Sequence, residues 1–540
     1  MPSPIGTAPR RRRRWPWVVA IGGALALVVA GLVAAVFEWS GASLAKDSTA
    51  LARLDVQTFG GSVEHVRAFD SHGRPIPVAL RDGRIVPRTR LAPGQRVTVD
   101  AIVSRPGSVG WLVGDTDHES ITLKTPAAHP RERWLTVSGG SRGRIAFDQP
   151  LRAVAVGAPD SLHRTAFSRP HGSVAIPSAA AAGTVEVATA PRPWEKLGRP
   201  RSVTWFPASG APTVVASPVP GATTSPTAPL RLTFSKPVGD ILGRARPTLS
   251  PATAGRWRRV DGHTLAFQPT GYGAPMGTTV RATLPRELAI VGAGGSTARS
   301  RTVSWTIPPG SILRLQQLLA QDGYLPVDWQ ASGAAVARTP SAQVRAAVDP
   351  PAGSFSWRYP NTPGQLKAMW SAGRSNEITR GALMAFENDH GMTADGVAGP
   401  QVWHALLADA ISGGGRSGVG YSYVYVSRNL PESLTLWHDG HDVITTPANT
   451  GIAAAPTATG TYPVFEHLPV GTMSGTNPDG SHYDDPGIRY ISYFNGGDAV
   501  HAFDRASFGT PQSLGCVELP LSAAAKVYPY MPIGTLVTIT

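Results

Sequence analysis

A single cysteine, Cys516, is the feature that most narrows what this 540-residue chain can fold into. One thiol excludes intrachain disulfides, multi-cysteine metal sites and iron–sulfur clusters. Each domain must therefore be held together by its own hydrophobic core. At roughly 150 residues per domain, the length predicts about three or four folding units. Hydrophobic residues make up 42% of the chain, which is enough for several modest cores.

Glycine and proline are abundant, with 59 and 50 residues, whereas charged residues make up only 16% of the chain. Average globular proteins have about 25% charged residues. The composition favours a turn-rich β architecture over helical bundles or coiled coils. It stays below the combined Gly and Pro content of roughly 25–30% that indicates general disorder. We therefore expect a multidomain, mainly β fold.

The N-terminal segment combines five consecutive arginines with a long apolar run. Residues 15–37 carry no charge and would span about 35 Å as a helix, which predicts a transmembrane signal anchor. Residues 1–14 are then cytoplasmic, because basic flanks stay inside. A cleaved signal peptide is the alternative, but the run is longer than a usual signal core and no good cleavage site follows. The expected location is the cell membrane, with a single pass and the rest of the chain outside.

The formal net charge of +14 is spread thinly beyond these arginines. No outer segment combines a dense Lys/Arg run with aromatic residues, so nucleic acid is not expected as a partner. A mildly basic exported chain suits an anionic envelope, and a solvated basic surface explains the charge equally well.

Short β-runs separated by Gly, Pro, Asp and Ser clusters extend from about 51 to 307. Residues 96–103 and 230–234 alternate apolar with polar side chains, as half-buried strands do. The run Arg-Ser-Val-Thr-Trp at 201–205 recurs as Arg-Thr-Val-Ser-Trp at 301–305, and a matching strand precedes each copy. These pairs suggest tandem domains of one fold, with chance resemblance of β-rich segments as the alternative.

We predict β-sandwich modules at 50–125, 126–207 and 211–307, with a Pro/Ser/Thr-rich linker at 207–229. The modules resemble the immunoglobulin-like domains that stand between membrane anchor and catalytic domain in actinobacterial wall enzymes. No catalytic group of residues stands out in them. The resemblance therefore implies that they act as spacers, which let the catalytic domain reach away from the membrane anchor.

The hydrophobic period changes between 310 and 409. Apolar residues from Ile312 to Leu319 and from Ile378 to Phe386 follow helical spacing, and a last short helix is expected near Trp403. The sequence predicts a small helical module at 311–410.

Three segments of this module, 315–324, 379–386 and 395–399, resemble the peptidoglycan-binding repeat of cell-wall hydrolases and transpeptidases. The chain departs from that family by the insertion 329–376 and by Glu387, where the family often has Gln. A purely structural spacer remains the alternative. The glycine-rich stretch 412–420 is expected to be a flexible linker.

The last domain, predicted at 421–540, returns to a strand pattern and contains His501 upstream of Cys516. A thiol of ordinary pKa is mostly protonated at neutral pH, so a catalytic cysteine needs a base, and histidine can later pass the proton to a leaving amine. Backbone N–H groups at Gly515 and Cys516 could stabilise an oxyanion. The competing interpretation is a buried structural cysteine with a structural histidine. An unpaired thiol in an exported chain is nevertheless prone to oxidation unless the sulfur is useful.

The sequence around these residues resembles the L,D-transpeptidase (YkuD-like) family. The resemblance is carried by His501, by Ser-Leu-Gly-Cys-Val at 513–517, by the strand 423–426 and by the Thr/Gly-rich segment 450–462. The order of anchor, immunoglobulin-like modules, wall-binding module and catalytic domain also fits actinobacterial members. The resemblance implies an acyltransferase whose cysteine forms a thioester with a peptidoglycan tetrapeptide stem, releases D-alanine and passes the acyl group to the amine of a neighbouring stem.

Carried onto this chain, the resemblance makes Cys516 the nucleophile and His501 its general base. The carbonyl of Ala502 would orient the imidazole, and the amides of Gly515 and Cys516 would hold the oxyanion, with Ser513 in the same motif. Peptidoglycan stem peptides are the expected partner, and neither a cofactor nor a metal is expected.

Two departures from the family flank the thiol. Leu514 replaces a usual His, and Glu518 stands where Arg or Asn is common, so altered specificity or lower activity follows as an expectation. A metal site at His482, Asp484 and Asp485 is a weaker hypothesis, because 477–486 has the composition of a polar loop.

Other cysteine-dependent enzyme families fit the sequence less well, because sortases and papain-like peptidases place their Cys and His differently along the chain. A non-catalytic peptidoglycan-binding tether with a degenerate last domain is one alternative, and an L,D-carboxypeptidase that uses water as acceptor is another.

Overall fold

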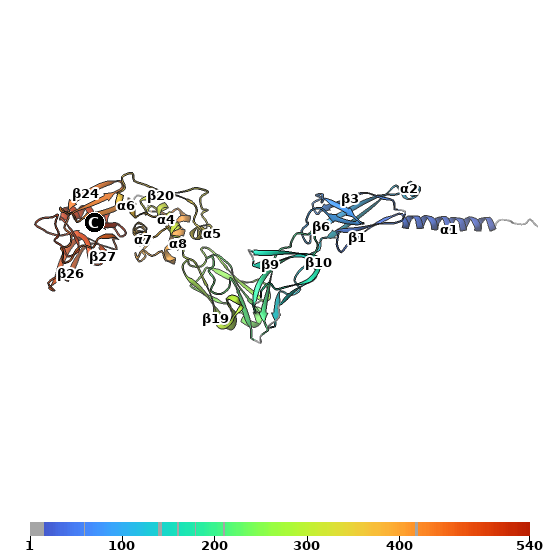
Figure 1. The fold of residues 1–540 in the computed structure, drawn as a ribbon, viewed down its shortest axis with the longest axis horizontal. Coiled ribbons are helices and arrows are strands. Elements are labelled where there is room, and N and C mark those ends of the chain that lie inside the picture. The colour runs from blue at the N-terminus through green and yellow to red at the C-terminus, as the bar shows by residue number, and fades with distance from the viewer. Residues whose placement is uncertain are drawn as a thin grey trace, which may run out of the picture. The chain divides into compact units, whose positions relative to one another are not determined.

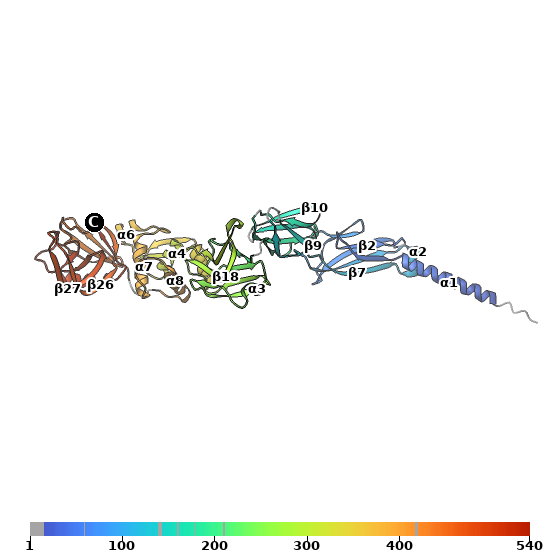
Figure 2. The same cartoon turned by 90° about the horizontal axis from the view of Figure 1, so that it is seen from below.

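The computed structural model describes residues 16–540 except 59, 139–142, 159–160, 179, 209–210 and 416–419. The described part is mainly β, with 44% strand and 18% helix. It divides into two units, Met1–Ala211 with Gly294–Ser296, and Pro212–Ala293 with Thr297–Thr540. Their elements are labelled in Figure 1 and in the rotated view of Figure 2.

The N-terminal apolar run forms helix α1 (Pro16–Trp39), but the predicted membrane-spanning element of the fold class is wrong. Crossing a bilayer takes about 20 consecutive apolar residues. The side chains described in α1 run from 23 to 36 and then resume at Trp39. Among the described residues, no helix is long and apolar enough to cross a membrane. The predicted cytoplasmic segment 1–14 lies outside the described residues.

The first unit begins with two antiparallel sheets that share one core. The four-stranded sheet has the order β1-β2-β5-β4 and the three-stranded sheet has the order β3-β6-β7. Buried side chains from both sheets, such as Ile85 and Val99, belong to one hydrophobic cluster. The elements are β1 (Ala42–Lys46), β2 (Ala52–Val56), β3 (Ser62–Asp70), β4 (Val78–Arg81), β5 (Arg84–Pro87), β6 (Arg96–Ser104), α2 (Gly107–Val113) and β7 (Thr116–Lys124).

A five-stranded sheet of order β10-β9-β11-β12-β8 completes the first unit. Its strands are β8 (Trp134–Val137), β9 (Arg144–Ala158), β10 (Ser161–Ala175), β11 (Gly183–Ala190) and β12 (Arg201–Pro207).

The second unit opens with a seven-stranded sheet. Its main path is β15-β18-β13-β14-β17-β16, and β19 pairs with β18. The elements are β13 (Thr213–Ser217), β14 (Leu230–Phe234), α3 (Val238–Leu242), β15 (Thr248–Ser250), β16 (Gly255–Arg259), β17 (Thr264–Pro269), β18 (Thr279–Val291) and β19 (Thr297–Thr306). β13 lies within the predicted linker 207–229, so that linker prediction is wrong there. Its buried Val214 and Val215 pair the strand into the sheet despite the flanking prolines.

The repeated Trp-containing strands occupy comparable surroundings in the two units. Trp205 on β12 lies opposite Gly183 of β11, and Trp305 on β19 lies opposite Val280 of β18. Each indole is buried, and its N–H donates to a backbone carbonyl, that of Ala180 over 2.9 Å in the first case and that of a proline in the second. The strand orders of the two sheets differ. The recurrence therefore extends to a pair of strands and its buried tryptophan.

Helices dominate from 312 to 412, where α4 (Ile312–Gln321), α7 (Glu377–Asp389) and α8 (Pro400–Ser412) match the predicted apolar spacing. The insertion 329–376 has structure of its own. It contributes most of the hairpin of β20 (Val327–Ala331) and β21 (Gly353–Trp357), together with α5 (Pro340–Val348) and α6 (Gly364–Met369). Part of the predicted linker 412–420, residues 416–419, lies outside the described residues.

The last segment contains two sheets, of orders β24-β23-β22-β30-β25 and β26-β27-β28-β29. Side chains from both sheets, among them Val424, Val500 and Val517, form one buried cluster. The elements are β22 (Ser422–Ser427), β23 (Ser433–His438), β24 (His441–Pro447), β25 (Gly460–Pro463), β26 (Glu466–Thr476), β27 (His482–Asn495), β28 (Asp498–Ala502), β29 (Val517–Leu519), α9 (Leu521–Val527), η2 (Tyr528–Tyr530) and β30 (Leu536–Ile539).

Candidate active site

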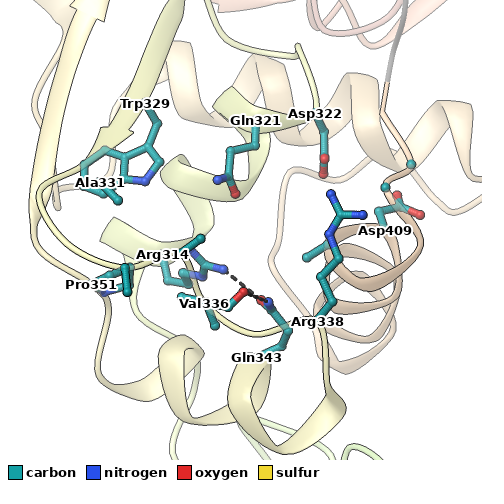
Figure 3. Close-up of a pocket in the computed structure, with 15 residues that line it drawn as sticks. Arg314, Gln321, Asp322, Trp329, Ala331, Val336, Arg338, Gln343, Pro351 and Asp409 are labelled. Carbon is teal, nitrogen blue, oxygen red and sulfur yellow. Dashed lines mark hydrogen bonds between the residues drawn. The ribbon is translucent and has the colours of Figure 1, made fainter.

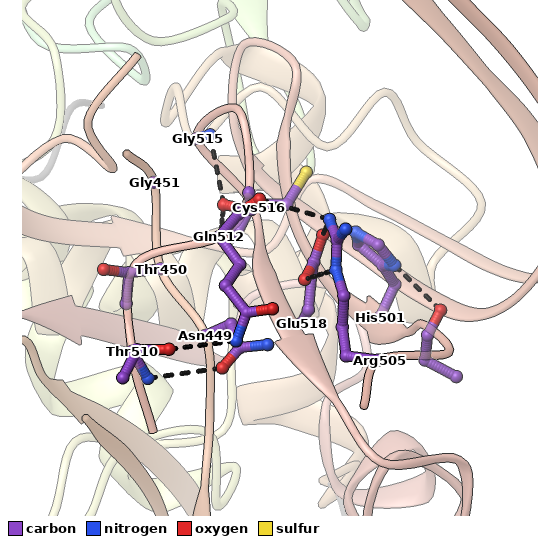
Figure 4. Close-up of polar contacts among 12 residues, drawn as sticks. Asn449, Thr450, Gly451, His501, Arg505, Thr510, Gln512, Gly515, Cys516 and Glu518 are labelled. Atoms are coloured by element: carbon purple, nitrogen blue, oxygen red, sulfur yellow. Dashed lines mark hydrogen bonds and ion pairs between the residues drawn. The ribbon is translucent and has the colours of Figure 1, made fainter. Parts of the chain in front are cut away.

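Two short parallel strands position the candidate residues. β28 pairs with β29, and His501 lies directly opposite Glu518 in the register. Paired residues project to the same face of a sheet, so the imidazole and this carboxylate share one face. Cys516 immediately precedes β29, and Figure 4 shows its sulfur on the side where His501 lies. The chain thus brings the thiol and the imidazole to one edge of the second sheet.

His501 is buried, with 3% of its surface exposed. Its Nδ1 lies 2.9 Å from the backbone oxygen of Ala502. A carbonyl oxygen only accepts, so Nδ1 donates its proton there, and Nε2 carries the lone pair of the neutral ring. Burial lowers the pKa of His501. The hydrogen bond to the Ala502 carbonyl and the charge of the Glu518 carboxylate act in the opposite direction, but the effect of burial is larger. The imidazole is therefore held as a neutral base in a fixed tautomer.

Cys516 retains partial solvent exposure, and its thiol lies 3.7 Å from the carbonyl oxygen of Gly497. Burial of the sulfur, together with the nearby carboxylates of Asp498 and Glu518, raises the pKa of Cys516 to about 12. A backbone hydrogen bond from Ala499 acts in the opposite direction. The resting thiol is consequently protonated at neutral pH, and forming a thiolate requires a proton acceptor.

The turn before the thiol is held by a serine and a glycine. Ser513 Oγ donates to the backbone oxygen of Cys516 over 2.6 Å, and the Gly515 N–H donates to Ser513 Oγ over 3.3 Å. Gly515 has φ +120°, which L side chains rarely adopt, and a Cβ there would collide with Asp498 Oδ1. Glycine is required at this position by both torsion angle and space. The predicted Gly515 donor is already engaged by a long hydrogen bond.

Arg505 is the residue that sequence reasoning missed. It forms two bonds to Glu518, with Nε at 2.8 Å from Oε2 and Nη2 at 2.6 Å from Oε1. Its guanidinium also lies 4.5 Å from the centre of the Phe503 ring, and Nη2 donates to the Gln512 carbonyl. Figure 4 shows the pair beside His501. The charge that Glu518 introduces is thus compensated locally, and the signal was that Arg505 is the only Lys or Arg between His501 and Cys516.

A second buried carboxylate holds the segment that contacts the loop before Cys516. Glu432 is 1% exposed and accepts hydrogen bonds from the backbone N–H of Thr450 at 2.6 Å and from its hydroxyl at 2.7 Å. The carbonyl of Thr450 in turn accepts from the N–H groups of Gln512 and Ser513. Buried charges are costly unless they are hydrogen-bonded in this way. The network fixes the loop that leads into Cys516.

The weaker metal hypothesis gains no support. His482, Asp484 and Asp485 lie in β27, so the predicted polar loop 477–486 is a strand from 482 onward. Within the described residues no group of three or more His, Cys, Asp or Glu is arranged to hold a metal ion.

Residues 422–539 match the family model described as the L,D-transpeptidase catalytic domain, YkuD. The C-terminal segment is an L,D-transpeptidase catalytic domain. No curated protein matches the chain. The match to this domain supports the prediction that the chain is a transpeptidase that acts on peptidoglycan.

Solved L,D-transpeptidases are among the structural neighbours. An L,D-transpeptidase from Mycobacterium smegmatis is 14% identical, with 61% of this chain and 99% of that chain covered and a TM-score of 0.21. The catalytic domain of an E. faecium L,D-transpeptidase is 25% identical, with 22% and 96% covered and a TM-score of 0.21. L,D-transpeptidase 3 from Mycobacterium tuberculosis, in complex with a faropenem-derived adduct, is 14% identical, with 60% and 96% covered and a TM-score of 0.21.

Proposed function

We propose that this chain crosslinks peptidoglycan stem peptides through a thioester on Cys516, with His501 as general base. The observation that carries the proposal is the neutral His501 ring on the thiol's side of the sheet, with Nδ1 engaged by Ala502 and Nε2 left as a base. The match of residues 422–539 to the L,D-transpeptidase domain supports the same reaction.

The proposed acylation is a proton-coupled attack. His501 Nε2 takes the thiol proton while Cys516 Sγ bonds to the carbonyl carbon of the donor stem, and the carbonyl oxygen becomes an oxyanion. When the intermediate collapses, the carbon–nitrogen bond to the terminal D-alanine breaks, and His501 returns the proton to the leaving amine. The acceptor amine then attacks the thioester and gives its proton to His501, and the released thiolate recovers that proton.

The electrostatics around the two residues support this order of events. The raised pKa of Cys516 and the lowered pKa of His501 keep the resting pair neutral. The imidazolium that forms during attack is stabilised by Glu518, whose charge raises the pKa of His501, and Arg505 moderates that effect. Glu518 therefore supports the base, in place of the second imidazole that Leu514 removes.

The oxyanion is proposed to bind the backbone amides of Gly515 and Cys516. Gly515 reaches its φ of +120° only as glycine, which aims this peptide group in a way that other residues cannot copy. Ser513, which now accepts from the Gly515 N–H at 3.3 Å, is proposed to fix the turn and to yield that donor to the stronger acceptor.

We further propose that the chain acts outside the cytoplasm, where peptidoglycan lies, and that the β-sheet modules between 42 and 306 provide reach. The proposal rests on the location of the substrate.

The test is product analysis with the purified full chain and tetrapeptide stems that carry a side-chain amine. Wild type and the control Ser522→Ala, an exposed position on α9, should release D-alanine and form crosslinked dimers. Cys516→Ala should do neither. Release of D-alanine without any dimer would favour the carboxypeptidase alternative, and an inactive wild type that still binds cell wall would favour the tether.

A further inference from the structure

A polar cavity of about 380 Å³ lies in the helical module, remote in sequence from the thiol. Figure 3 shows Arg314 on α4 and Asp322 just after it, with Arg338 and Asp409 at the same opening. Trp329 forms part of one wall. Ligand sites commonly measure about 300–1,000 Å³, so this cavity has the size for a small ligand.

Arg314 brings a buried positive charge to this cavity. Its side chain is enclosed, with 2% of the residue exposed, and it donates to Gln317 Oε1 at 3.1 Å and Gln343 Oε1 at 2.8 Å. Its Nε has no hydrogen-bond partner, and among the described residues no carboxylate is within ion-pair distance of the guanidinium. Burial lowers the pKa of Arg314 to about 10. Neutral amides therefore hold a cation whose charge is not matched by direct contact.

Asp322 brings a buried acid to the same cavity. It is 5% exposed, and its Oδ2 has no hydrogen-bond partner. Burial, together with the charge of Asp409, raises the pKa of Asp322 to about 7, although Arg314 acts in the opposite direction. Asp409 is itself bonded to His390 Nε2 at 3.0 Å. Both charge signs are thus present, each with an unpartnered buried atom.

Such an arrangement is costly for a purely structural core. Unpaired charges and unsatisfied polar atoms in a protein interior destabilise the fold unless complementary groups reach them. Most of the remaining lining, including Val336, Arg338 and Pro351, comes from the insertion 329–376. The cavity therefore arises where the chain departs from the repeat it resembles.

We propose that this cavity binds a small zwitterion, either a free amino acid or a free dipeptide whose two termini both lie in the cavity. The carboxylate of the ligand pairs with Arg314 and Arg338, and its ammonium group pairs with Asp322 and Asp409. Figure 3 shows the four charged side chains around the cavity, and all of them line it, so the cavity offers both signs of charge to a ligand. The site is separate from the thiol and goes beyond the proposed transpeptidation.

The test uses the full chain with Cys516→Ala, so that no probe is turned over. D-alanine and D-alanyl-D-alanine are titrated by calorimetry, and hydrogen–deuterium exchange locates the binding. Protection is expected in α4 and α5, and the tighter probe identifies the source of the zwitterion. N-acetyl-D-alanine, which lacks the ammonium group, and D-alaninamide, which lacks the carboxylate, should bind about tenfold more weakly or not at all.

Two variants keep the proposal falsifiable. Asp322→Asn and the exposed Arg338→Gln should each weaken binding about tenfold, whereas the controls Asp349→Asn and Arg345→Gln, which do not line the cavity, should not. Absence of saturable binding, protection confined to 422–539, equal binding of the capped probes, or unchanged affinity in both cavity variants would each overturn the proposal. None of these outcomes depends on whether Cys516 forms a thioester.

Discussion

Replacing Arg505 with methionine should strip Glu518 of its counter-ion while keeping a side chain of similar length. Glu518 has a side chain only 4% exposed, and both of its oxygens are bonded to the guanidinium, at 2.8 and 2.6 Å. Removing one partner of a buried ion pair costs about 3–5 kcal/mol, because the other charge stays buried. The Arg505 side chain is 30% exposed, so water partly replaces it, and we expect the lower end, about 3 kcal/mol.

The assay must report on the site rather than on the whole chain. Several folding units would blur a single unfolding midpoint, so the free energy is measured by native-state hydrogen exchange of amides in β28 and β29. Arg489→Met, at an exposed position on β27, is the matched control and should change exchange little. The double variant Arg505→Met/Glu518→Leu removes both charges and should recover about 2 kcal/mol relative to Arg505→Met alone.

Two results would refute this reasoning. The first is unchanged exchange of the β28 and β29 amides in Arg505→Met. The second is a double variant at least as destabilised as the sum of the two single variants, because that outcome means that the ion pair carries no coupling energy.

Further predictions concern the turn and the titrating groups. Gly515→Ala should destabilise the turn by about 1–3 kcal/mol and lower kcat/KM at least about tenfold, whereas Gly497→Ala, with open space and no positive φ, should have little effect on either. The acidic limb of the kcat/KM profile should have its midpoint below pH 6.5, because the lowered pKa of His501 keeps the base neutral until the pH falls below its ordinary value; a midpoint above 6.5 contradicts this. Alkylation of Cys516 by iodoacetamide should be slow at pH 7 and still rise above pH 9, since its pKa is raised to about 12; a plateau by pH 8 contradicts this.

Local patterning predicts strands in the last segment, although it assigns 477–486 to a polar loop that is a strand from 482 onward. Residues 433–438, which lie within this predicted strand pattern, form β23. The proximity of His501 and Cys516 can also be predicted from the sequence. His501 lies at the end of a strand pattern, and Cys516 follows a glycine in the loop before the next strand. Such local signals survive because buried alternating faces fix their own register.

Side-chain contacts between segments that are distant in the sequence could not be predicted from the sequence. The pairing of Glu518 with Arg505 depends on how the loop after β28 folds back over β29, and no periodic pattern encodes that path. The bonds from Thr450 to Glu432 were missed for the same reason. Each involves a single polar residue, whose partner becomes evident only once the strands are placed.

Composition gives a wrong prediction for two segments. The Pro/Ser/Thr-rich stretch 207–229 is predicted to be a linker, but its residues 213–217 form a strand, because their Val-Val pair supplies enough apolar surface to join a sheet. The N-terminal apolar run was expected to cross a membrane, and no helix among the described residues meets that requirement.

The most direct test of the central claim is the intact mass of the full chain after incubation with a carbapenem or with a tetrapeptide stem. We expect a covalent adduct on the wild type, mapped by digestion to the peptide that contains Cys516, and none on Cys516→Ala. An unmodified wild type, or an equal adduct on Cys516→Ala, would contradict catalysis through this thiol.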